Sequence, residues 1–185
     1  MSFLGDMVFI AEVKTQSPFE FRAEKSWGEL FEIANQYGDW ISIHTDSRWG
    51  GSFDLIRKAR GQTQKPILAK GIHLKDDDVR MAVEAGADFV LVVGRIPNVY
   101  SEKCILEPYT LTELREIPKK FRALWNARDL ATGNPKKESF ADARAAWSGW
   151  LVQASNIKTI GDIQVGADAV LVGEHLEQFI KSMKA

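Results

Sequence analysis

The sequence has little cysteine and no surplus of charge of either sign, and both absences exclude classes of protein. Its single cysteine, Cys104, builds neither a disulfide framework nor a cysteine-based zinc site, which is typical of a reducing compartment. The 24 Lys and Arg residues against 25 Asp and Glu residues leave a net charge of −1, so no overall positive field attracts nucleic acid or an anionic membrane. We therefore expect no nucleic-acid partner, and an anionic ligand must be bound by a local group of cations.

Long apolar runs and an export signal are also missing. No segment approaches the ~20 apolar residues that a membrane helix needs, and the first 14 residues carry Asp6 and Glu12 without a basic leader. The rest is ordinary for a globular chain of 185 residues, with 45% hydrophobic and 26% charged residues. We expect one domain over residues 1–185, cytoplasmic and without a membrane partner.

Short runs rich in Val, Ile and Leu alternate with stretches of helical spacing, which predicts a parallel sheet with crossover helices. Eight strands are expected, at residues 7–13, 40–44, 66–70, 89–93, 104–107, 121–126, 150–154 and 169–172. Helices are expected at residues 25–37, 53–61, 75–85, 110–117, 139–147, 159–165 and 176–183. The fourth crossover has only residues 94–103, with Pro97 and Asn98 near its start, so we expect its helix to be shortened or missing.

An internal repeat bears on the topology. Residues 86–92, GADFVLV, recur as residues 166–172, GADAVLV, an offset of 80 residues that fits four βα units of ~20 residues each. The repeat indicates either half-barrel symmetry or a loop common to any parallel fold, and the strands are parallel in both cases. Because the Gly-x-Gly-x-x-Gly turn of an open doubly wound sheet is absent after Val13, we favour a minimal (β/α)8 TIM barrel.

Charged residues stand where several of these strands end. Residues two apart on a strand share a face, so Glu12 and Lys14 point the same way, and Lys70 and Glu107 end two further strands. The sixth expected strand ends at Asn126, and Arg128 follows two residues later. Each charged residue taken alone is compatible with a solvated ion pair, but barrel enzymes place their catalytic residues at this end of the strands. Three cations (Lys14, Lys70 and Arg128) outnumber two carboxylates (Glu12 and Glu107), which predicts a small anionic ligand.

The seventh and eighth strands end in small and polar residues. Ser155, Asn156 and Gly173 are suited to phosphate binding through backbone N–H groups, although a glycine after a buried strand is also an ordinary turn residue. The three histidines have no metal-binding spacing, so no metal is expected. Most of the six tryptophans belong to the core, with Trp49 and Trp125 as alternatives that flank an aromatic ligand.

Several segments between about residue 9 and residue 176 carry a family resemblance. They are residues 10–14 (IAEVK) with Ser17 and Pro18, 41–46 (ISIHTD) with 50–52 (GGS), 66–70 (PILAK), 84–88 (EAGAD), 105–107 (ILE) with 112–114 (TEL), 126–130 (NARDL) and 167–174 (ADAVLVGE). Together they resemble indole-3-glycerol-phosphate synthase, a (β/α)8 enzyme of tryptophan biosynthesis, and segments 10–14 and 126–130 are the most specific.

The resemblance implies a carboxy-lyase that uses no cofactor and no metal. It closes the indole ring of 1-(2-carboxyphenylamino)-1-deoxyribulose 5-phosphate with loss of CO₂ and water. By position, Lys70 corresponds to the general acid and Glu107 to the acid or base of the dehydration step. Lys14 corresponds to the residue that holds the anthranilate carboxylate, and Glu12 to the residue that orients the lysines.

The resemblance also implies a binding set for the sugar phosphate. Asn126 and Arg128 correspond to substrate-binding residues. Ser17, Ser155 and Gly173 correspond to residues that hold the phosphate. The partner implied is therefore a small anionic sugar phosphate.

The chain departs from the family pattern at the same end of the barrel. Ala154 stands where the family has a glutamate and Asn156 where it has a phosphate-contacting glycine, and the extra N-terminal helix is not present. We expect these changes to reduce activity. Two alternatives stay open, namely a phosphosugar-binding barrel with a different reaction, such as an isomerisation, and a non-catalytic relative that serves as a binding or subunit protein. A monomer and a homodimer are both compatible with the sequence.

Overall fold

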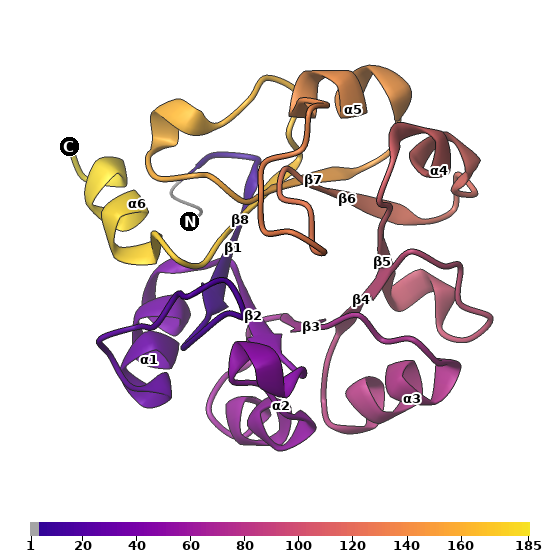
Figure 1. Cartoon of the computed structure of the whole chain (residues 1–185). Coiled ribbons are helices and arrows are strands. Elements are labelled where there is room, and N and C mark those ends of the chain that lie inside the picture. Colours follow the sequence, from indigo (N-terminus) through magenta and orange to yellow (C-terminus); the bar gives the residue numbers. More distant parts are fainter. Residues whose placement is uncertain (1–3) are drawn as a thin grey trace.

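The computed structural model describes residues 4–185, which form a closed barrel of eight parallel strands in chain order (Figure 1). This confirms the predicted (β/α)8 fold. The strands are β1 (Val8–Val13), β2 (Trp40–His44), β3 (Ile67–Lys70), β4 (Phe89–Val93), β5 (Cys104–Glu107), β6 (Arg122–Asn126), β7 (Leu151–Ala154) and β8 (Ala169–Val172). Each lies within one residue of its predicted bounds.

Helices surround the barrel, and most begin at a side chain that caps the first backbone N–H groups. They are α1 (Trp27–Tyr37), α2 (Phe53–Arg60), α3 (Asp76–Glu84), α4 (Leu111–Glu116), α5 (Phe140–Ala146) and α6 (Leu176–Met183). Ser26, Ser52, Thr110 and Ser139 cap α1, α2, α4 and α5. The described residues before β1, 4–7, form a turn, whereas residues 1–3 lie outside the described part.

Two crossovers have a single 3₁₀ turn in place of an α-helix. The fourth has η2 (Ser101–Lys103), which confirms the expectation of a shortened connection. The seventh has only η3 (Ile160–Asp162), so the helix predicted at residues 159–165 is wrong. The Gln153 side chain donates to the Asp162 carbonyl and accepts from the Gln164 N–H, so it takes backbone groups that a continued helix bonds internally. Gly161 inside the turn lowers helix propensity further.

The strands separate two apolar layers because successive side chains point to opposite faces. Phe9, Ala11 and Val13 of β1 belong to the large cluster between barrel and helices. Ile10 belongs to a smaller cluster inside the barrel. The interior cluster also contains residues from β3 to β8, namely Leu68, Leu91, Ile105, Leu124, Val152, Ala154 and Leu171. The alternation along β1 therefore directs Glu12 toward the barrel interior, as predicted.

Aromatic rings close the amino-terminal end of the barrel. Trp40 stacks on Phe89 with ring centroids 4.2 Å apart and on Trp150 at 5.6 Å. The Arg122 guanidinium lies over the rings of Phe89 and Trp150. Because this end is plugged by large apolar groups, polar chemistry is restricted to the opposite end.

The repeated Gly-Ala-Asp segment has the same structural task in both halves. Asp88 accepts from the Ile67 N–H at 2.8 Å and pairs with Arg60 of α2. Asp168 likewise accepts from the Leu151 N–H at 2.8 Å and pairs with Arg144 of α5. In both copies the aspartate before a strand (β4 or β8) therefore bonds to the first residue of the preceding strand (β3 or β7). The role of the repeat is structural in both places.

Candidate active site

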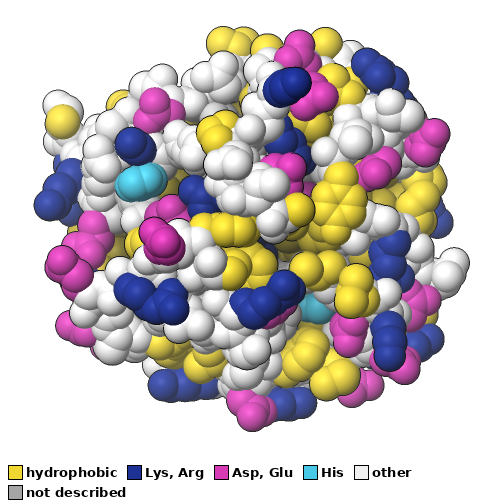
Figure 2. Space-filling view, in the orientation of Figure 1, with side chains coloured by type: hydrophobic (Ala, Val, Ile, Leu, Met, Phe, Trp, Pro, Cys, Tyr) yellow, Lys and Arg dark blue, Asp and Glu magenta, His cyan; other side chains and the backbone are white. Residues whose placement is uncertain are grey.

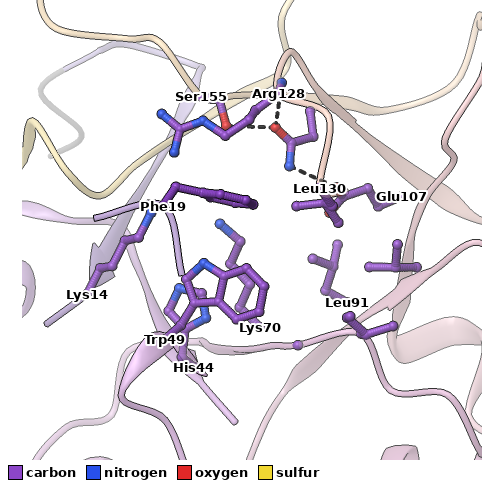
Figure 3. A pocket seen from close by; sticks show the side chains of 14 residues that line it. Lys14, Phe19, His44, Trp49, Lys70, Leu91, Glu107, Arg128, Leu130 and Ser155 are labelled. Carbon is purple, nitrogen blue, oxygen red and sulfur yellow. Dashed lines mark hydrogen bonds between the residues drawn. The ribbon is translucent and has the colours of Figure 1, made fainter. Parts of the chain in front are cut away.

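Most of the charged side chains predicted at the strand ends line one hollow at the carboxyl-terminal end of the barrel (Figure 3). This central cavity, between Lys70, Glu107 and Trp49, encloses about 490 Å³ of empty space, part of it open to solvent. A second hollow, the β8 cavity, encloses about 360 Å³ beside Gly173 and Glu174. The two cavities share Lys14, Lys70, Arg128 and Ser155.

Glu12 is the centre of an ion-pair network on the β1–β3 side. Its Oε1 accepts from Lys70 Nζ at 2.5 Å and from His44 Nε2 at 2.8 Å. Burial works to raise the pKa of Glu12, but the positive charge of Lys70 and the hydrogen bond from His44 outweigh burial and hold it well below its usual value. Burial lowers the pKa of His44, so a neutral imidazole donates its Nε2–H to an ionised carboxylate.

Glu107 lies across the cavity and has a different surrounding. Its Oε1 accepts from the Asn126 side-chain amide at 2.8 Å, a neutral donor. Burial raises the pKa of Glu107 by more than the positive charge of Lys70 and the Asn126 hydrogen bond lower it. Ser155 donates to the other end of the same amide at 2.7 Å, so Asn126 is held between the two (Figure 3).

Lys14 and Arg128 both pair with Glu174, the residue after Gly173. Lys14 Nζ lies 2.7 Å from Glu174 Oε1, and the Arg128 guanidinium donates to both carboxylate oxygens at 2.9 and 3.3 Å. Burial works to raise the pKa of Glu174, yet the hydrogen bonds from Arg128 and Lys14 lower it to about 2. Burial lowers the pKa of Lys14.

The three residues predicted to hold phosphate, two serines and a glycine, lie in different surroundings. A Cβ at Gly173 would overlap the Glu12 carboxylate, so glycine is required there by Glu12 itself. Ser17 is buried in the β1–α1 loop, where its hydroxyl accepts from the Phe19 N–H at 3.1 Å. Ser155 lines both cavities, whereas Ser17 lines neither, so the structure does not bring the three residues together.

The cavity has an apolar wall that sequence reasoning identified only in part. Phe19, Trp49, Ile72, Leu91 and Leu130 line it beside the charged groups. Side chains of both kinds adjoin near the centre of the face shown in Figure 2. Trp49 fits the alternative of a ring that flanks a ligand. Trp125 does not, because its side chain is fully buried in the layer outside the barrel.

Two charged or polar residues of the site were not predicted. His44 was weighed only as a metal ligand, although the alternation Trp40, Ser42, His44 places it on the inner face of β2. Glu174 lies two residues beyond the last residue of β8, and no periodicity fixes its direction there. Among residues 4–185, no group of three or more His, Cys, Asp or Glu side chains is arranged to hold a metal ion.

Ala154 and Gln153 end β7 with opposite orientations. Ala154 belongs to the interior cluster and pairs in register with Asn126 of β6. Gln153 points out of the barrel toward the η3 segment, as expected from the alternation. The interior end of β7 therefore supplies no carboxylate to the cavity.

Comparison with known proteins gives the family. The model of the indole-3-glycerol phosphate synthase family matches residues 2–109, more than half of the chain. The chain is 28% identical to the tryptophan biosynthesis protein TrpCF of Vibrio parahaemolyticus over 91% of its own length, but it spans only 40% of that protein. It is 24% identical to an indole-3-glycerol phosphate synthase of Staphylococcus aureus strain MRSA252, with 96% of this chain and 80% of that protein covered. A synthase of Acaryochloris marina is 30% identical, with 90% and 65% covered.

Fold and site together define a (β/α)8-barrel protein with acid–base and cationic groups at the carboxyl ends of its strands. The chain belongs to the indole-3-glycerol phosphate synthase family. The family match includes Glu12, Lys14, Lys70 and Glu107 and ends before the rim of β6–β8, where Ala154 and Glu174 lie. No helix among residues 4–185 is both long enough and apolar enough to cross a membrane.

Proposed function

We propose that this barrel is a lyase that closes the indole ring of 1-(2-carboxyphenylamino)-1-deoxyribulose 5-phosphate. The observation that carries the proposal is that Lys14, Lys70 and Glu107, at the ends of three separate strands, line one cavity with an apolar wall, and that Glu12 beside it bonds to Lys70. Such a cavity suits a substrate with an aromatic ring at one end and a polar chain at the other. The family assignment favours this reaction over others that a barrel can host.

In the first step the aryl carbon that bears the carboxylate attacks the ketose carbonyl carbon. Lys70, oriented by its bond to Glu12, would deliver a proton to the carbonyl oxygen as the new carbon–carbon bond forms. The carboxylate then leaves as CO₂ and its bonding electrons return to the ring. Lys14 would bind that carboxylate before it leaves, and Arg128 would bind the remaining polar part of the substrate.

In the second step the hydroxyl formed from the carbonyl takes up a proton and leaves as water, the neighbouring ring carbon gives up a proton, and the indole double bond forms. Glu107 is the proposed acid or base of this step, because it lies in the cavity and burial raises its pKa above that of an ordinary carboxyl group. Asn126 would hold Glu107 in place and contact the substrate. Ser155 and the backbone at Gly173 are the proposed contacts for the phosphate.

The direct test is turnover by the purified chain. With the carboxyphenylamino ribulose phosphate as substrate, we expect an indole product whose fluorescence rises above the tryptophan background, together with one CO₂ per indole. Because no carboxylate extends from Ala154, we expect a low rate that Ala154→Glu increases. Absence of both indole and CO₂ at micromolar enzyme concentrations contradicts the proposal.

A second candidate is a different conversion of a related phosphosugar, such as isomerisation of an aminated ribulose phosphate. The observation that favours it is the combination of Ala154 and Glu174 on the β7–β8 rim, beside an otherwise complete Glu12–Lys70 pair. In this case the indole assay stays blank, while an aminated ribulose phosphate is consumed and Lys70→Ala abolishes that consumption. The two candidates are therefore separated by product analysis.

A further inference from the structure

Glu174 occupies the position where the cavity offers most positive charge. Its carboxylate bridges Lys14 and Arg128 with three hydrogen bonds between 2.7 and 3.3 Å, and its side chain is only 17% exposed. The two cations come from β1 and from the loop after β6, so the carboxylate joins two separate parts of the rim. Proteins also bind a ligand carboxylate or phosphate with an ammonium group and a bidentate guanidinium.

The cations that line the two cavities are already paired with carboxylates of the chain. Lys70 is bound by Glu12, and Lys14 and Arg128 are bound by Glu174. An anionic ligand that takes the same N–H groups must therefore displace an internal carboxylate, either Glu12 or Glu174. Displacing Glu12 is the harder of the two, because its side chain is 3% exposed and also bonded to His44, whereas Glu174 lies on a short connection next to solvent.

We propose that Glu174 is a specificity-determining residue that competes with the anionic group of the substrate for Lys14 and Arg128. The inference rests on the proposed function only in taking the substrate to be an anion. An anion binds at Lys14 and Arg128 only in the molecules in which Glu174 has moved away from them. The apparent affinity for the anion is therefore the intrinsic affinity multiplied by the fraction of such molecules. Glu174 thus selects against small free anions and in favour of a substrate whose other contacts, along the apolar wall, help to displace it.

The ammonium of Lys14 and the guanidinium of Arg128 can bind either anionic end of the proposed substrate, its aryl carboxylate or its phosphate. Lys14 lines both the central cavity and the β8 cavity, and so does Arg128. Two probes distinguish the ends: 2-aminobenzoate for the carboxylate and inorganic phosphate for the phosphate. The probe whose affinity increases more when Glu174 is neutralised identifies the substrate group, carboxylate or phosphate, with which Glu174 competes.

The experiment compares anion binding by the wild-type chain and by Glu174→Gln, using titration calorimetry at fixed ionic strength. We expect Glu174→Gln to bind at least one probe about tenfold more tightly, because the neutral amide no longer holds the two cations. The matched control is Glu177→Gln, which removes one carboxylate three residues later, where Glu177 pairs with Lys25 at the surface. The control is expected to bind both probes like the wild type.

Thermal unfolding provides a second readout that does not depend on turnover. Glu174→Gln leaves two neighbouring cations without their carboxylate, so its Tm is expected to fall and to be restored by phosphate or 2-aminobenzoate more than the wild-type Tm is raised. Glu174→Ala gives the same comparison if the glutamine disturbs packing. The inference is overturned if neither variant binds either probe more tightly, or if Glu177→Gln gains as much. A gain in anion affinity without any indole formation upholds the inference and rejects the proposed reaction.

Discussion

Two carboxylates on opposite sides of the cavity have equal burial and opposite electrostatics. Glu12 is the next-to-last residue of β1 and Glu107 is the last residue of β5, four strands away around the closed barrel, and both are 3% exposed. The pKa of Glu12 is held well below the usual value, whereas burial raises the pKa of Glu107. Burial alone raises the pKa of both, so the difference comes from their hydrogen-bond partners.

The partners divide the site into two halves with different tasks. On the β1–β3 half, Glu12 bonds to Lys70 and His44, and this half keeps a fixed negative charge that orients a lysine. On the β5–β6 half, Glu107 has only the neutral amide of Asn126 as its hydrogen-bond donor, and burial raises its pKa, so its proton is retained to higher pH. A ring closure followed by a dehydration needs both an ionised carboxylate that orients a lysine and a carboxyl group that keeps its proton to higher pH. A variant in one half can therefore be compared with the unchanged other half.

The largest expected effect is the loss of Lys70. Lys70→Met keeps the length of the side chain but removes the ammonium that donates to Glu12. Because a positioned acid contributes about 10²–10⁴-fold, we expect kcat to fall by about 10³-fold in the indole assay. Lys75→Met, which removes an exposed lysine at the start of α3 near the same end of the barrel, is the control and retains wild-type kcat. A Lys70→Met enzyme within tenfold of the wild type rejects Lys70 as the acid.

Glu12→Gln is expected to have the next largest effect, on stability. The substitution leaves Lys70 and His44 facing a neutral amide, and breaking a buried pair from one side costs about 3 kcal/mol of unfolding free energy. Since the folded pKa of Glu12 is lowered, its contribution is present above the unfolded carboxyl pKa of about 4.3 and is lost as pH falls through the folded pKa.

Denaturant unfolding at pH 7 and at pH 4 checks this sign. The difference between wild type and Glu12→Gln is expected to be greatest at pH 7 and to shrink on acidification. Glu24→Gln, at an exposed position ahead of α1, is expected to change neither value by more than about 0.5 kcal/mol. An equal destabilisation at both pH values would mean that packing, and not charge, explains the loss.

The half of the site built on regular strands was predictable, because alternation fixes direction. Residues two apart on β1 placed Glu12 with Ile10 inside the barrel, and the structure has both there. The same rule places His44 on the inner face of β2, so its direction toward the barrel interior could be predicted from the sequence. What the alternation does not supply is the choice of partner, which depends on barrel closure.

The residues beyond the strand ends were not predictable in the same way. Glu174 follows β8 and Ser17 lies in the irregular loop after β1, so neither has a period that fixes its direction. Glu174 turned toward Lys14 and Arg128, whereas Ser17 turned into its own loop. Predictions based on the family position of these residues therefore depend on side-chain directions that only the folded chain determines.

Glu107→Gln is expected to reverse the sign seen at Glu12. Because burial raises the folded pKa, the wild-type chain loses stability as pH rises from about 4.3 through the folded pKa of Glu107, and the glutamine variant does not. We expect the variant to be more stable than the wild type at pH 8 by about 1 kcal/mol and to lose about 10²-fold in kcat. Unfolding curves at pH 5 and pH 8 and steady-state kinetics measure the two effects.

The Asn126 contact supplies the control for Glu107. Asn126→Asp puts a second carboxyl group 2.8 Å from Glu107 Oε1 in place of the amide donor, and it is expected to raise the pKa of Glu107 further. The alkaline decline of kcat should then move to higher pH. Two results together would contradict the role of Glu107: an unchanged pH profile in Asn126→Asp and an unchanged activity in Glu107→Gln. The acid or base of the dehydration step would then be another residue.

The smallest expected effect concerns His44 as a positioning residue. His44→Phe keeps a ring that can stack on Trp49 but removes the donor to Glu12, so we expect about 1 kcal/mol of lost stability. Burial lowers the folded pKa of His44, so the wild type loses stability as pH falls below the unfolded value of about 6.5, and His44→Phe lacks that decline.

The kinetic signature separates positioning by His44 from simple packing. If the imidazole orients the Glu12–Lys70 pair, kcat falls about tenfold in His44→Phe while KM is unchanged, because the pair acts in the transition state and not in ground-state binding. His44→Gln retains an N–H donor and is expected to recover most of kcat. Equal kcat values for the two variants would show that the bond to Glu12 contributes to stability alone, and the charge of Glu12 would then depend on Lys70 without help from β2.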